Sequence, residues 1–533
     1  MSKENTTKLL RILLQKNPKT HAGLNKIKRK FARDEKISAM VTNAELLSLY
    51  QELLSLDEIA DNPSLRLLLK KRAIRTLSGV APIAVLTKSY PCPGKCAFCP
   101  TEAQMPKSYL SNEPAVMRAV LTKFDPFKQV SVRLKALADN GHATDKIELI
   151  VMGGTWSCLP KRYQTNYIKR CFDAGNGKVS SSLKAAQKLN ETAKHRIVGV
   201  TLETRPDYIT EEEIKRYRLL GCTKVEIGIQ TTDDNILKLN KRGHGRKEII
   251  RATKLLKDAG FKVAYHLMPN LPGATPKKDL EVFQELFSNP DFQPDMLKIY
   301  PCVVVKGSEL YNWWRAGKYK PYTDKQLVDL LLKIKLTVPD YVRIIRLIRD
   351  IPKESIEAGN VISNLRQYLK AELAAQKKLC KCTRCREART NISRVADAKL
   401  FTRKYQASGG TEYFLQFASK DQKILYAFLR LRLPSSKDNF IPELKNAALI
   451  REVHTYGRLV PIAKKEDRAV QHLGFGSKLM KESEKIAKKA GYDKMAVISG
   501  VGVRGFYRKL GYKLQGTYMV KNIKYKVKMK NDI

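Results

Sequence analysis

Three cysteines on one short loop are the residues of this chain best suited to chemistry. They lie in Pro91-Cys92-Pro93-Gly94-Lys95-Cys96-Ala97-Phe98-Cys99. The C-x3-C-x2-C spacing of Cys92, Cys96 and Cys99 lets them hold three irons of a [4Fe–4S] cluster, since thiolates are the usual cluster ligands. The fourth iron is then open to bind S-adenosylmethionine (SAM) and cleave it reductively. The alternatives are unligated thiols or a structural zinc site, although structural zinc usually takes four ligands from two separated pairs.

A second cysteine group follows in the basic segment Lys377-Lys378-Leu379-Cys380-Lys381-Cys382-Thr383-Arg384-Cys385-Arg386. Three thiolates at this spacing suit Zn²⁺, so Cys380, Cys382 and Cys385 predict a zinc knuckle. The sequence names no fourth ligand, and a knuckle without metal is the alternative. Six of the ten cysteines fall in these two groups, which favours metal binding over disulfides.

A glycine-rich motif, Gln471-His472-Leu473-Gly474-Phe475-Gly476, precedes a helical stretch from Ser477 to Lys489. Glycines allow close backbone approach, and free N–H groups at a helix start can hold a pyrophosphate. The alternative is an ordinary helix that begins at a glycine. The segments Met495–Ile498 and Phe506-Tyr507-Arg508-Lys509-Leu510-Gly511-Tyr512 follow the motif.

The elements that must position these residues alternate between strand and helix patterns. Short apolar runs separated by helical stretches predict parallel strands, in either a barrel or an open doubly wound sheet. The cysteine loop follows the first run, and barrel enzymes carry their chemistry at the carboxyl ends of strands, so a partial barrel is favoured. The runs are Ala81–Leu86, Ile147–Met152, Ile197–Leu202, Val225–Gln230, Val263–Leu267 and Met296–Tyr300. After Ala407–Gly410, the pattern predicts strand, strand, loop, helix, strand, helix, strand.

The charge of the chain points to a polyanionic partner. The 533 residues carry 100 Lys and Arg against 52 Asp and Glu, a formal net charge of +48. Nucleic acid is the first candidate, and a generally basic, soluble protein is the alternative. Membrane surfaces are disfavoured because the basic runs lack an amphipathic aromatic anchor. With no long apolar stretch and a polar start, the sequence predicts a soluble cytoplasmic protein.

The glycine motif with its following segments resembles the GNAT acyltransferase fold, whose first motif holds the pyrophosphate of acetyl-CoA. Together with the cysteine loop, it resembles the catalytic subunit of Elongator in a stand-alone archaeal or bacterial type. The resemblance rests on long segments, with departures at Thr101-Glu102 and Met105–Tyr109. The matching segments are Arg75–Val80, the cysteine loop, Val151–Thr155, Leu202–Asp207, Glu226–Gln230, Leu297–Pro301, Cys380–Glu387, Ala448–Glu452 and Val497–Gly502.

The resemblance implies an α/β fold: a radical-SAM partial (β/α) barrel fused to a GNAT acetyltransferase-like α/β domain, with a helical basic N-terminal region and a small zinc knuckle. The expected regions are 1–75 (helical, tRNA-binding), 76–375 (radical SAM), 376–400 (cysteine linker) and 401–533 (acetyl-CoA-binding). The cofactors implied are a [4Fe–4S] cluster, SAM and Zn²⁺, with acetyl-CoA as substrate.

The resemblance also implies a set of binding residues. Gly153 and Gly154 end one strand and would approach SAM, as would Glu203 and Gln230, although Glu and Gln at strand ends are also commonly structural. Lys146 would contact acetyl-CoA, with an ordinary surface lysine as the alternative. Tyr507 would lie near the thioester, and Lys298 is expected to give electrostatic support. The remaining residues expected to bind acetyl-CoA are Glu452, Val453, His454, Thr455, Gln471, Gly474, Phe475, Gly476 and Ser477.

The activity implied is modification of uridine 34 of tRNA. A 5′-deoxyadenosyl radical would take hydrogen from the methyl group of acetyl-CoA, and addition to C5 would give 5-carboxymethyluridine. Basic helices around Lys26, Lys28, Arg29 and Lys30, the knuckle and residues 341–378 are expected to contact the tRNA. An electron donor is required, and a homodimer is possible. The rivals are a histone or other protein lysine acetyltransferase that uses Glu452 or His454 as base, and a non-catalytic RNA-binding scaffold.

Overall fold

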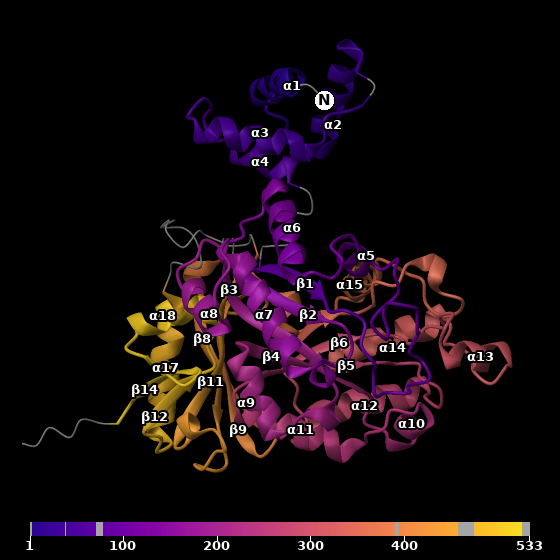
Figure 1. The fold of residues 1–533 in the computed structure, drawn as a ribbon, viewed down its shortest axis with the longest axis vertical. Helices are drawn as coiled ribbons and strands as arrows, with labels where there is room; N and C mark the ends of the chain where they lie inside the picture. The colour runs from indigo at the N-terminus through magenta and orange to yellow at the C-terminus, as the bar shows by residue number, and fades with distance from the viewer. Residues whose placement is uncertain (1–2, 38, 71–77, 390–393, 457–473, 525–533) are drawn as a thin grey trace, which may run out of the picture.

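The computed structural model describes residues 3–37, 39–70, 78–389, 394–456 and 474–524. Two sheets lie side by side, and a group of helices projects from the first of them (Figure 1). None of the described helices is long and apolar enough to cross a membrane.

Four helices near the start of the chain enclose an apolar core of their own, built around Leu10, Leu46 and Tyr50. The first helix packs on the second and third, and the third also contacts α6 of the next region. Figure 1 shows the group standing above the rest of the molecule, next to the end of α6. The helices are α1 (Lys3–Lys16), α2 (His21–Asp34), α3 (Asn43–Ser55) and α4 (Pro63–Leu69).

Seven parallel strands then form one sheet whose spatial order, β1 to β7, is the order of the chain. The order never reverses and β7 does not pair with β1, so the sheet is an open partial barrel, as the sequence predicts. The strands are β1 (Ala81–Leu86), β2 (Lys146–Met152), β3 (Arg196–Thr204), β4 (Cys222–Gln230), β5 (Lys262–Leu267), β6 (Met296–Ile299) and β7 (Arg343–Arg346).

Helices connect the strands and cover their outer face. Every second residue of β2, such as Leu149, is fully buried beneath these helices. The helices are α5 (Pro114–Leu121), α6 (Pro126–Asp139), α7 (Lys161–Asn176), α8 (Leu183–Asn190), α9 (Glu211–Leu219), α10 (Asp234–Leu239), α11 (Arg246–Asp258), α12 (Pro276–Ser288), α13 (Glu309–Arg315), α14 (Asp324–Thr337) and α15 (Leu365–Ala375).

The second sheet is mixed and has the order β13-β14-β12-β11-β10-β9-β8. Only β11 and β12 pair in parallel, and α17 packs over β9, β10 and β11. The sequence pattern has four strands and so missed three of the seven. The elements are β8 (Lys399–Ala407), β9 (Gly410–Ala418), β10 (Leu425–Leu433), β11 (Ala447–Thr455), α17 (Phe475–Lys489), β12 (Lys494–Val497), α18 (Arg504–Lys509), β13 (Lys513–Gln515) and β14 (Tyr518–Asn522).

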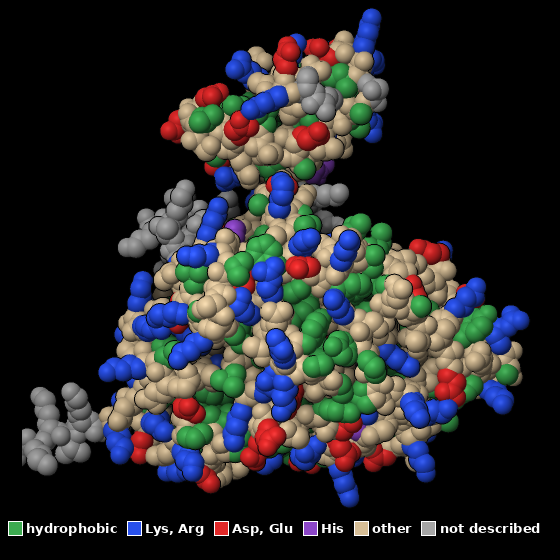
Figure 2. All heavy atoms as spheres, in the orientation of Figure 1, with side chains coloured by type: hydrophobic (Ala, Val, Ile, Leu, Met, Phe, Trp, Pro, Cys, Tyr) green, Lys and Arg blue, Asp and Glu red, His purple; other side chains and the backbone are tan. Residues whose placement is uncertain are grey.

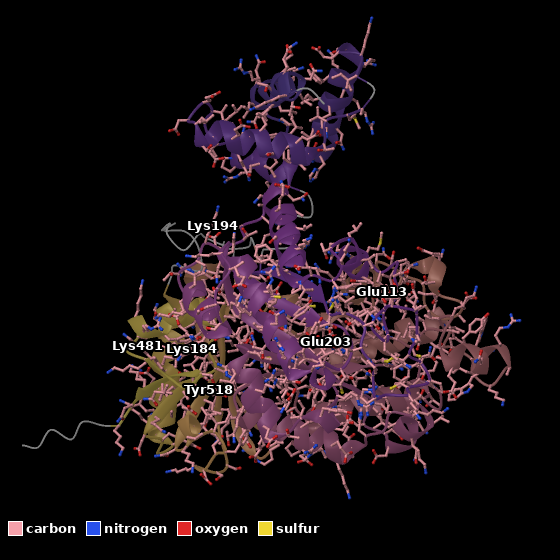
Figure 3. All side chains as sticks on the ribbon, viewed as in Figure 1. Glu113, Lys184, Lys194, Glu203, Lys481 and Tyr518 are labelled. Carbon is pink, nitrogen blue, oxygen red and sulfur yellow. The ribbon has the colours of Figure 1, made fainter. Side chains whose placement is uncertain are left out.

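The second sheet docks against the barrel through buried polar contacts. Arg451 Nη2 lies 2.5 Å from Asp295 Oδ1, and Tyr518, labelled in Figure 3, donates to the carbonyl of Ala259 at 2.8 Å. Arg432 donates to Asp258 at 2.6 Å. Because Asp258, Ala259 and Asp295 all lie just before strands β5 and β6, the second sheet meets the amino ends of the barrel strands.

Candidate functional site

The cysteine loop follows the carboxyl end of β1, where barrel enzymes place their reacting groups. Arg242 Nη1 donates to Cys96 Sγ at 3.0 Å, and Arg205 lies so near that a Cβ on Gly94 would be 2.7 Å from its Nη1. Two guanidinium groups beside the thiols favour the thiolate form, which is the form that binds iron. Burial, with Cys96 nearby, raises the pKa of Cys99 when no metal is bound.

The spread of the sulfur atoms also fits a cluster. Among the described residues, the sulfurs of Cys380, Cys382 and Cys385 lie within 4.8 Å of one another, whereas those of Cys92, Cys96 and Cys99 do not form such a group. Ligands of one tetrahedral zinc ion must be close together because each Zn–S bond is about 2.3 Å. Ligands of a [4Fe–4S] cluster each bind a different iron and stand further apart. The wider spacing of the loop sulfurs is compatible with a cluster.

Gly153 and Gly154 follow β2 next to this loop, with φ angles of 136° and 93°. A Cβ on Gly153 would lie 1.9 Å from Thr87 Oγ1, so only glycine fits this position. The two glycines, Thr87 and Glu203 surround a small void that is too narrow for a water molecule. Within the described part of the chain, the buried oxygens Thr87 Oγ1 and Gln230 Oε1 have no hydrogen-bond partner. Buried oxygens in this state suit a polar ligand such as the amine or ribose of SAM.

Inside the barrel, ion pairs connect the strands. Lys298 on β6 lies 3.2 Å from Glu203 on β3 and also pairs with Glu226 on β4. Glu226 in turn accepts a hydrogen bond from His266 Nε2 at 3.0 Å, and Tyr109 donates to Glu203 at 2.9 Å. Figure 3 shows Glu203 within the barrel region.

The network fixes the charge of Lys298. Burial alone lowers a lysine pKa, but the attraction of Glu226 outweighs it and raises the pKa of Lys298 above its usual value. Lys298 therefore stays protonated in its ion pairs, and it is unsuited to act as a base. Glu203, Glu226 and His266 also form a group with metal-ligand spacing, but Lys298 already neutralises both carboxylates.

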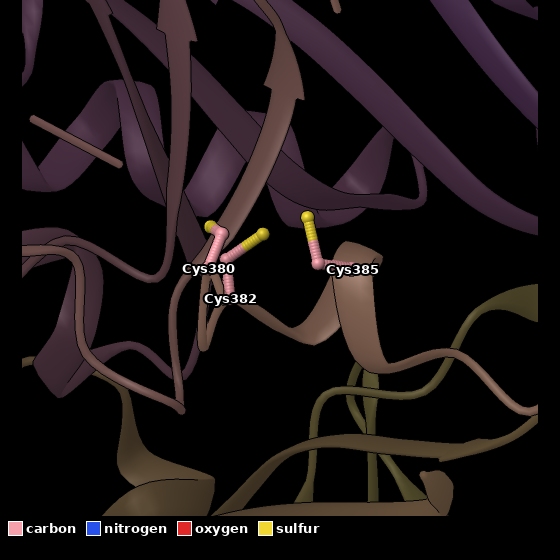
Figure 4. A group of neighbouring side chains, drawn as sticks. All are labelled: Cys380, Cys382 and Cys385. Carbon is pink, nitrogen blue, oxygen red and sulfur yellow. The ribbon is translucent and has the colours of Figure 1, made fainter. Parts of the chain in front are cut away.

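The knuckle cysteines converge as Figure 4 shows, with Cys385 on the short helix α16 (Thr383–Arg386) facing Cys380 and Cys382. Hydrogen bonds from the two neighbouring thiols hold the pKa of Cys382 well below its usual value. Three close sulfurs, one of them a thiolate, fit a zinc site. Among the described residues, the group consists of these three cysteines and includes no fourth ligand. The knuckle joins the two sheets, since Thr383 N donates to Val342 O at 2.9 Å and Arg386 Nη1 to Gln416 Oε1 at 2.9 Å.

The residues expected to bind acetyl-CoA gather at the carboxyl end of β11. A Cβ on Gly476, at the start of α17, would lie 3.9 Å from Thr455 Oγ1. Burial and the nearby Glu452 raise the pKa of Tyr507. Gly474 takes a φ of 71° just before α17, and Phe475 packs against Phe417 with ring centroids 4.6 Å apart. Val453 pairs with Leu429 within the sheet, Ser477 lies in the first turn of α17, and Gln471 lies outside the described residues.

The end of β11 also meets the amino ends of the barrel strands. His454 Nε2 donates to the carbonyl of Ser78, just before β1, at 2.8 Å. Glu452 lies 3.6 Å from Lys262 at the start of β5. Arg343, at the start of β7, donates to the hydroxyl of Tyr456 at 3.0 Å. Lys146 begins β2 at this same end, and burial lowers its pKa.

The two proposed bases of the acetyltransferase rival are engaged to different degrees. Burial alone would raise the pKa of Glu452, but Lys262 and Arg430 outweigh it and hold the pKa below its usual value. Arg430 Nε donates to Glu452 at 2.9 Å. His454 donates Nε2–H to Ser78 and burial lowers its pKa, so the ring is neutral and its acceptor nitrogen is Nδ1. Of the two, only Glu452 is therefore held in ion pairs. A proton acceptor held in two ion pairs is a weak general base.

Some basic residues expected to contact tRNA have structural roles. Lys28 is buried and donates to Asn43 at 2.8 Å, so the expectation of a phosphate contact there is wrong. Within 341–378, Arg343 pairs with Glu387 at 2.6 Å, Arg349 pairs with Glu113 at 3.0 Å, and Arg366 donates to the carbonyl of Ile344 at 3.1 Å. These side chains hold the fold together and are not free for phosphates.

Sequence reasoning missed several residues near the cysteine loop and inside the barrel. Glu226 and Arg205 lie in segments that match the family, but neither residue was given a role from the sequence alone. Arg242, His244 and His266 gave no signal of their own. His244 is buried behind the loop, where burial and the charges of Arg242 and Arg205 lower its pKa to about 3.

Comparison with known proteins agrees with this arrangement. Residues 88–286 match the Radical SAM superfamily, and residues 294–375 match the Radical_SAM C-terminal domain. The tRNA uridine(34) acetyltransferase of Methanocaldococcus infernus is 45% identical over 471 residues, covering 86% of this chain and 88% of that protein. Its counterpart in Dehalococcoides mccartyi is 45% identical over 459 residues, covering 85% and 100%.

Elongator complex protein 3 of Homo sapiens is 40% identical over 473 residues, covering 86% of each chain. A solved structure of the archaeal Methanocaldococcus infernus Elp3, with an N-terminal deletion, superposes with a TM-score of 0.74 at 43% identity, covering 84% of this chain and 99% of that chain. This chain therefore belongs to the family of the tRNA uridine(34) acetyltransferases and Elongator complex protein 3, with a radical SAM partial barrel and a second, mixed-sheet domain.

Proposed function

We propose that this protein is an acyltransferase that modifies the wobble uridine 34 of tRNA by radical chemistry started from SAM. One observation carries the proposal. A cysteine loop suited to a [4Fe–4S] cluster lies at one end of the barrel, and the strand suited to acetyl-CoA lies at the other end. The names of the relatives add uridine 34 of tRNA as the substrate.

Cys92, Cys96 and Cys99 would hold a [4Fe–4S] cluster, which when bound would supply the electron for reductive cleavage of SAM. The chain's own residues supply the remaining needs. Arg205 and Arg242 stabilise the thiolates, while Gly153, Gly154, Glu203 and Gln230 offer backbone and polar side-chain groups for SAM. Lys298 holds Glu203 and Glu226 in fixed positions.

The product proposed is 5-carboxymethyluridine. The acetyl methyl radical would bond to C5, the adduct would release the C5 proton to solvent and one electron to an oxidant such as the electron carrier that serves the enzyme, and water would hydrolyse the thioester to release CoA. The target base has to leave its stack to reach an enclosed site. A carbon radical suits addition to the electron-rich C5, whereas Glu452, held by Arg430 and Lys262, is a weak base for direct acetyl transfer. We further propose that the four sequence regions, 1–75, 76–375, 376–400 and 401–533, divide these tasks, with Zn²⁺ in the knuckle.

The test uses the full chain with its cluster reconstituted anaerobically. It is incubated with SAM, a reductant, methyl-labelled acetyl-CoA and bulk tRNA, and the nucleosides are then analysed by mass spectrometry. We expect label in 5-carboxymethyluridine, and its loss in Cys96→Ala. Cys171→Ala, at a buried cysteine of α7, is the matched control and should retain the label. Labelled protein lysines with unmodified tRNA would refute the proposal and support the acetyltransferase.

A further inference from the structure

The two candidate sites lie at opposite ends of the same barrel. Gly153 and Gly154 follow the carboxyl end of β2, whereas Lys146 begins β2 beside the contacts of β11 with β1, β5 and β7. A strand of this length, Lys146–Met152, spans about 20 Å at roughly 3.3 Å per residue. A reaction that uses both sites has to bring one substrate along the length of the barrel from one site to the other.

The inner faces of β1 and β2 are only partly buried along that path. Residues on the helix side of β2, such as Leu149, are fully buried, whereas each residue on the inner side is partly exposed. The strand register places Pro82 opposite Glu148 and Ala84 opposite Ile150, so these pairs share the inner face. The partly exposed inner residues are Pro82, Ala84, Lys146, Glu148, Ile150 and Met152.

The opposite wall of the barrel is closed by ion pairs. Glu203, Lys298, Glu226 and Lys224 follow one another across β3, β6 and β4, and Lys224 Nζ lies 2.5 Å from Glu148 Oε1. The Glu148 side chain keeps 27% of its surface exposed, while those of Lys224 and Glu226 keep 6% and 1%. The inner faces of β1 and β2 therefore keep partial exposure to solvent, and Glu148 on this side is paired with Lys224.

We propose that these inner faces line the passage through which the acyl arm of acetyl-CoA, held at the end of β11, reaches the SAM site. The inference rests on the proposed function and adds a route and a size limit to it. A pantetheine arm is a slender uncharged chain with amide groups, which suits a channel with paired charges and an apolar midpoint. Ala84 and Ile150 form that midpoint, halfway along the two strands.

In the step that follows, a C–H bond of the acyl methyl group breaks homolytically. The hydrogen atom, with its electron, forms the new C–H bond of 5′-deoxyadenosine, and the unpaired electron stays on the acyl carbon. The electron that cleaved SAM comes from the reduced cluster, which an external reductant recharges. Because a hydrogen atom transfers only at contact distance, blocking the passage prevents this step.

The test follows deuterium from trideuterated acetyl-CoA into 5′-deoxyadenosine, using the reconstituted full chain with SAM, reductant and tRNA. Ala84→Phe fills the midpoint, and we expect deuterium transfer to fall about a hundredfold, since misplacement of a reacting group by about 1 Å can cost that much. Ala316→Phe, at an exposed position after α13, is the matched control. Iron content and the unfolding midpoint check that the variants fold.

Deuterium transfer by Ala84→Phe at the wild-type rate would overturn the passage. Ile150→Ala provides an independent test, because a wider midpoint should raise the use of propionyl-CoA relative to acetyl-CoA. This variant tests the passage even if Ala84→Phe does not fold. An unchanged preference would contradict the inference. Absence of deuterium transfer in the wild-type protein would instead refute the proposed function, so the two failures are distinguishable.

Discussion

Glu452 is the residue whose surroundings best separate the two activities considered for the second domain. It is held by Arg430 and Lys262, which keep its pKa below the usual value. We predict that Glu452→Gln lowers the free energy of unfolding by about 1–3 kcal/mol, because a charged hydrogen-bond partner of Arg430 is lost. It should leave the shape of the pH–activity profile between pH 6 and 9 unchanged, because Glu452 does not titrate there.

The pH dependence of this stability difference has a definite sign. A carboxyl group whose folded pKa is lowered contributes stability above its unfolded pKa, near 4.3, and loses it as the pH falls through the folded value. Denaturant unfolding of wild type and Glu452→Gln should therefore differ by a constant amount at neutral pH and converge below about pH 4. A difference that grows as the pH falls would contradict the ion-pair assignment.

At the scale of single residues, sequence spacing predicts a site only where its ligands lie close together in the chain. Cys92, Cys96 and Cys99 lie within one loop, so their pattern was visible. Arg242 reaches Cys96 across 146 positions, and His266 reaches Glu226 across 40, so both contacts depend on the fold. Lys28 sits in a basic run, yet the helix turns it into the apolar core.

Among the elements, the loop before α18 shows that a motif can serve docking of the two domains. A Cβ on Gly500 would lie 1.9 Å from the carbonyl oxygen of Val198 on β3, whereas a Cβ on Gly505 has nothing within 4 Å. We predict that Gly500→Ala lowers the free energy of unfolding by about 1–3 kcal/mol through overpacking. Gly505→Ala is the matched control and should be neutral or slightly stabilising, because alanine favours the helix.

Chemical denaturation of the two alanine variants measures this difference. Equal stability of Gly500→Ala and Gly505→Ala would show that the backbones separate at no cost and that the close approach is unimportant. Since Val497–Gly502 also carries the family resemblance, such a result would point to a role for the segment other than docking.

The knuckle connects the end of the barrel to the second sheet, and its metal should stabilise both. We predict one zinc per chain by elemental analysis, with loss of the metal and a lower unfolding temperature in Cys382→Ser, because metal binding contributes directly to folding. Cys158→Ser, at a half-buried cysteine outside both groups, should retain the zinc. Full zinc content in Cys382→Ser would exclude the knuckle as the site.

Strand prediction succeeded for β1 to β6 because each strand contains a short, mostly apolar run between helices, although several strands also carry an inward-facing charge. It missed β7, whose four residues Arg343–Arg346 include two arginines. Arg343 is drawn into the sheet by its ion pair with Glu387, a contact between segments that no local pattern reveals. The prediction also missed β8, because most of its side chains are exposed and several are charged, so it has no apolar run.

Over the whole molecule, we expect some basic residues of the surface to contribute more to tRNA binding than others. Figure 2 shows Lys and Arg spread over the visible face, so charge alone does not mark the binding site. We predict that reversing exposed Lys26, Arg29 and Lys30 to Glu weakens tRNA binding and reduces the salt slope by about 2–3, near 0.7–0.9 per phosphate contact. Reversing Lys184, Lys188 and Lys194, two of which Figure 3 labels, changes the net charge equally and is the control.

Filter binding or anisotropy at several salt concentrations gives both slopes. If the two triple variants lose affinity equally, net charge dominates and the helical region has no special share in binding. If only the control variant weakens, the tRNA contacts lie on the α8 face.

The two domains should unfold as one unit, because their interface is a shared ion network. Arg451 bridges Asp295 and Glu412, with nitrogen–oxygen distances of 2.5 and 3.0 Å, and all three side chains are fully buried. Lys257 lies 3.7 Å from the same two carboxylates, but burial lowers its pKa to about 8, so its charge is barely compensated. Removing one partner of a buried pair costs about 3–5 kcal/mol, whereas replacing a poorly compensated charge by an apolar group costs little.

We therefore predict that Arg451→Met splits the calorimetric unfolding of the chain into two transitions, while Lys257→Met unfolds in a single transition close to that of the wild type. The pH dependence distinguishes them further. A lysine whose folded pKa is lowered to about 8 makes stability rise with pH between about 8 and 10.4, because the unfolded chain alone binds the proton there. Lys257→Met should remove that rise. A single transition in Arg451→Met would mean that apolar contacts hold the domains together without the network, and that the fixed distance between the two candidate sites does not depend on Arg451.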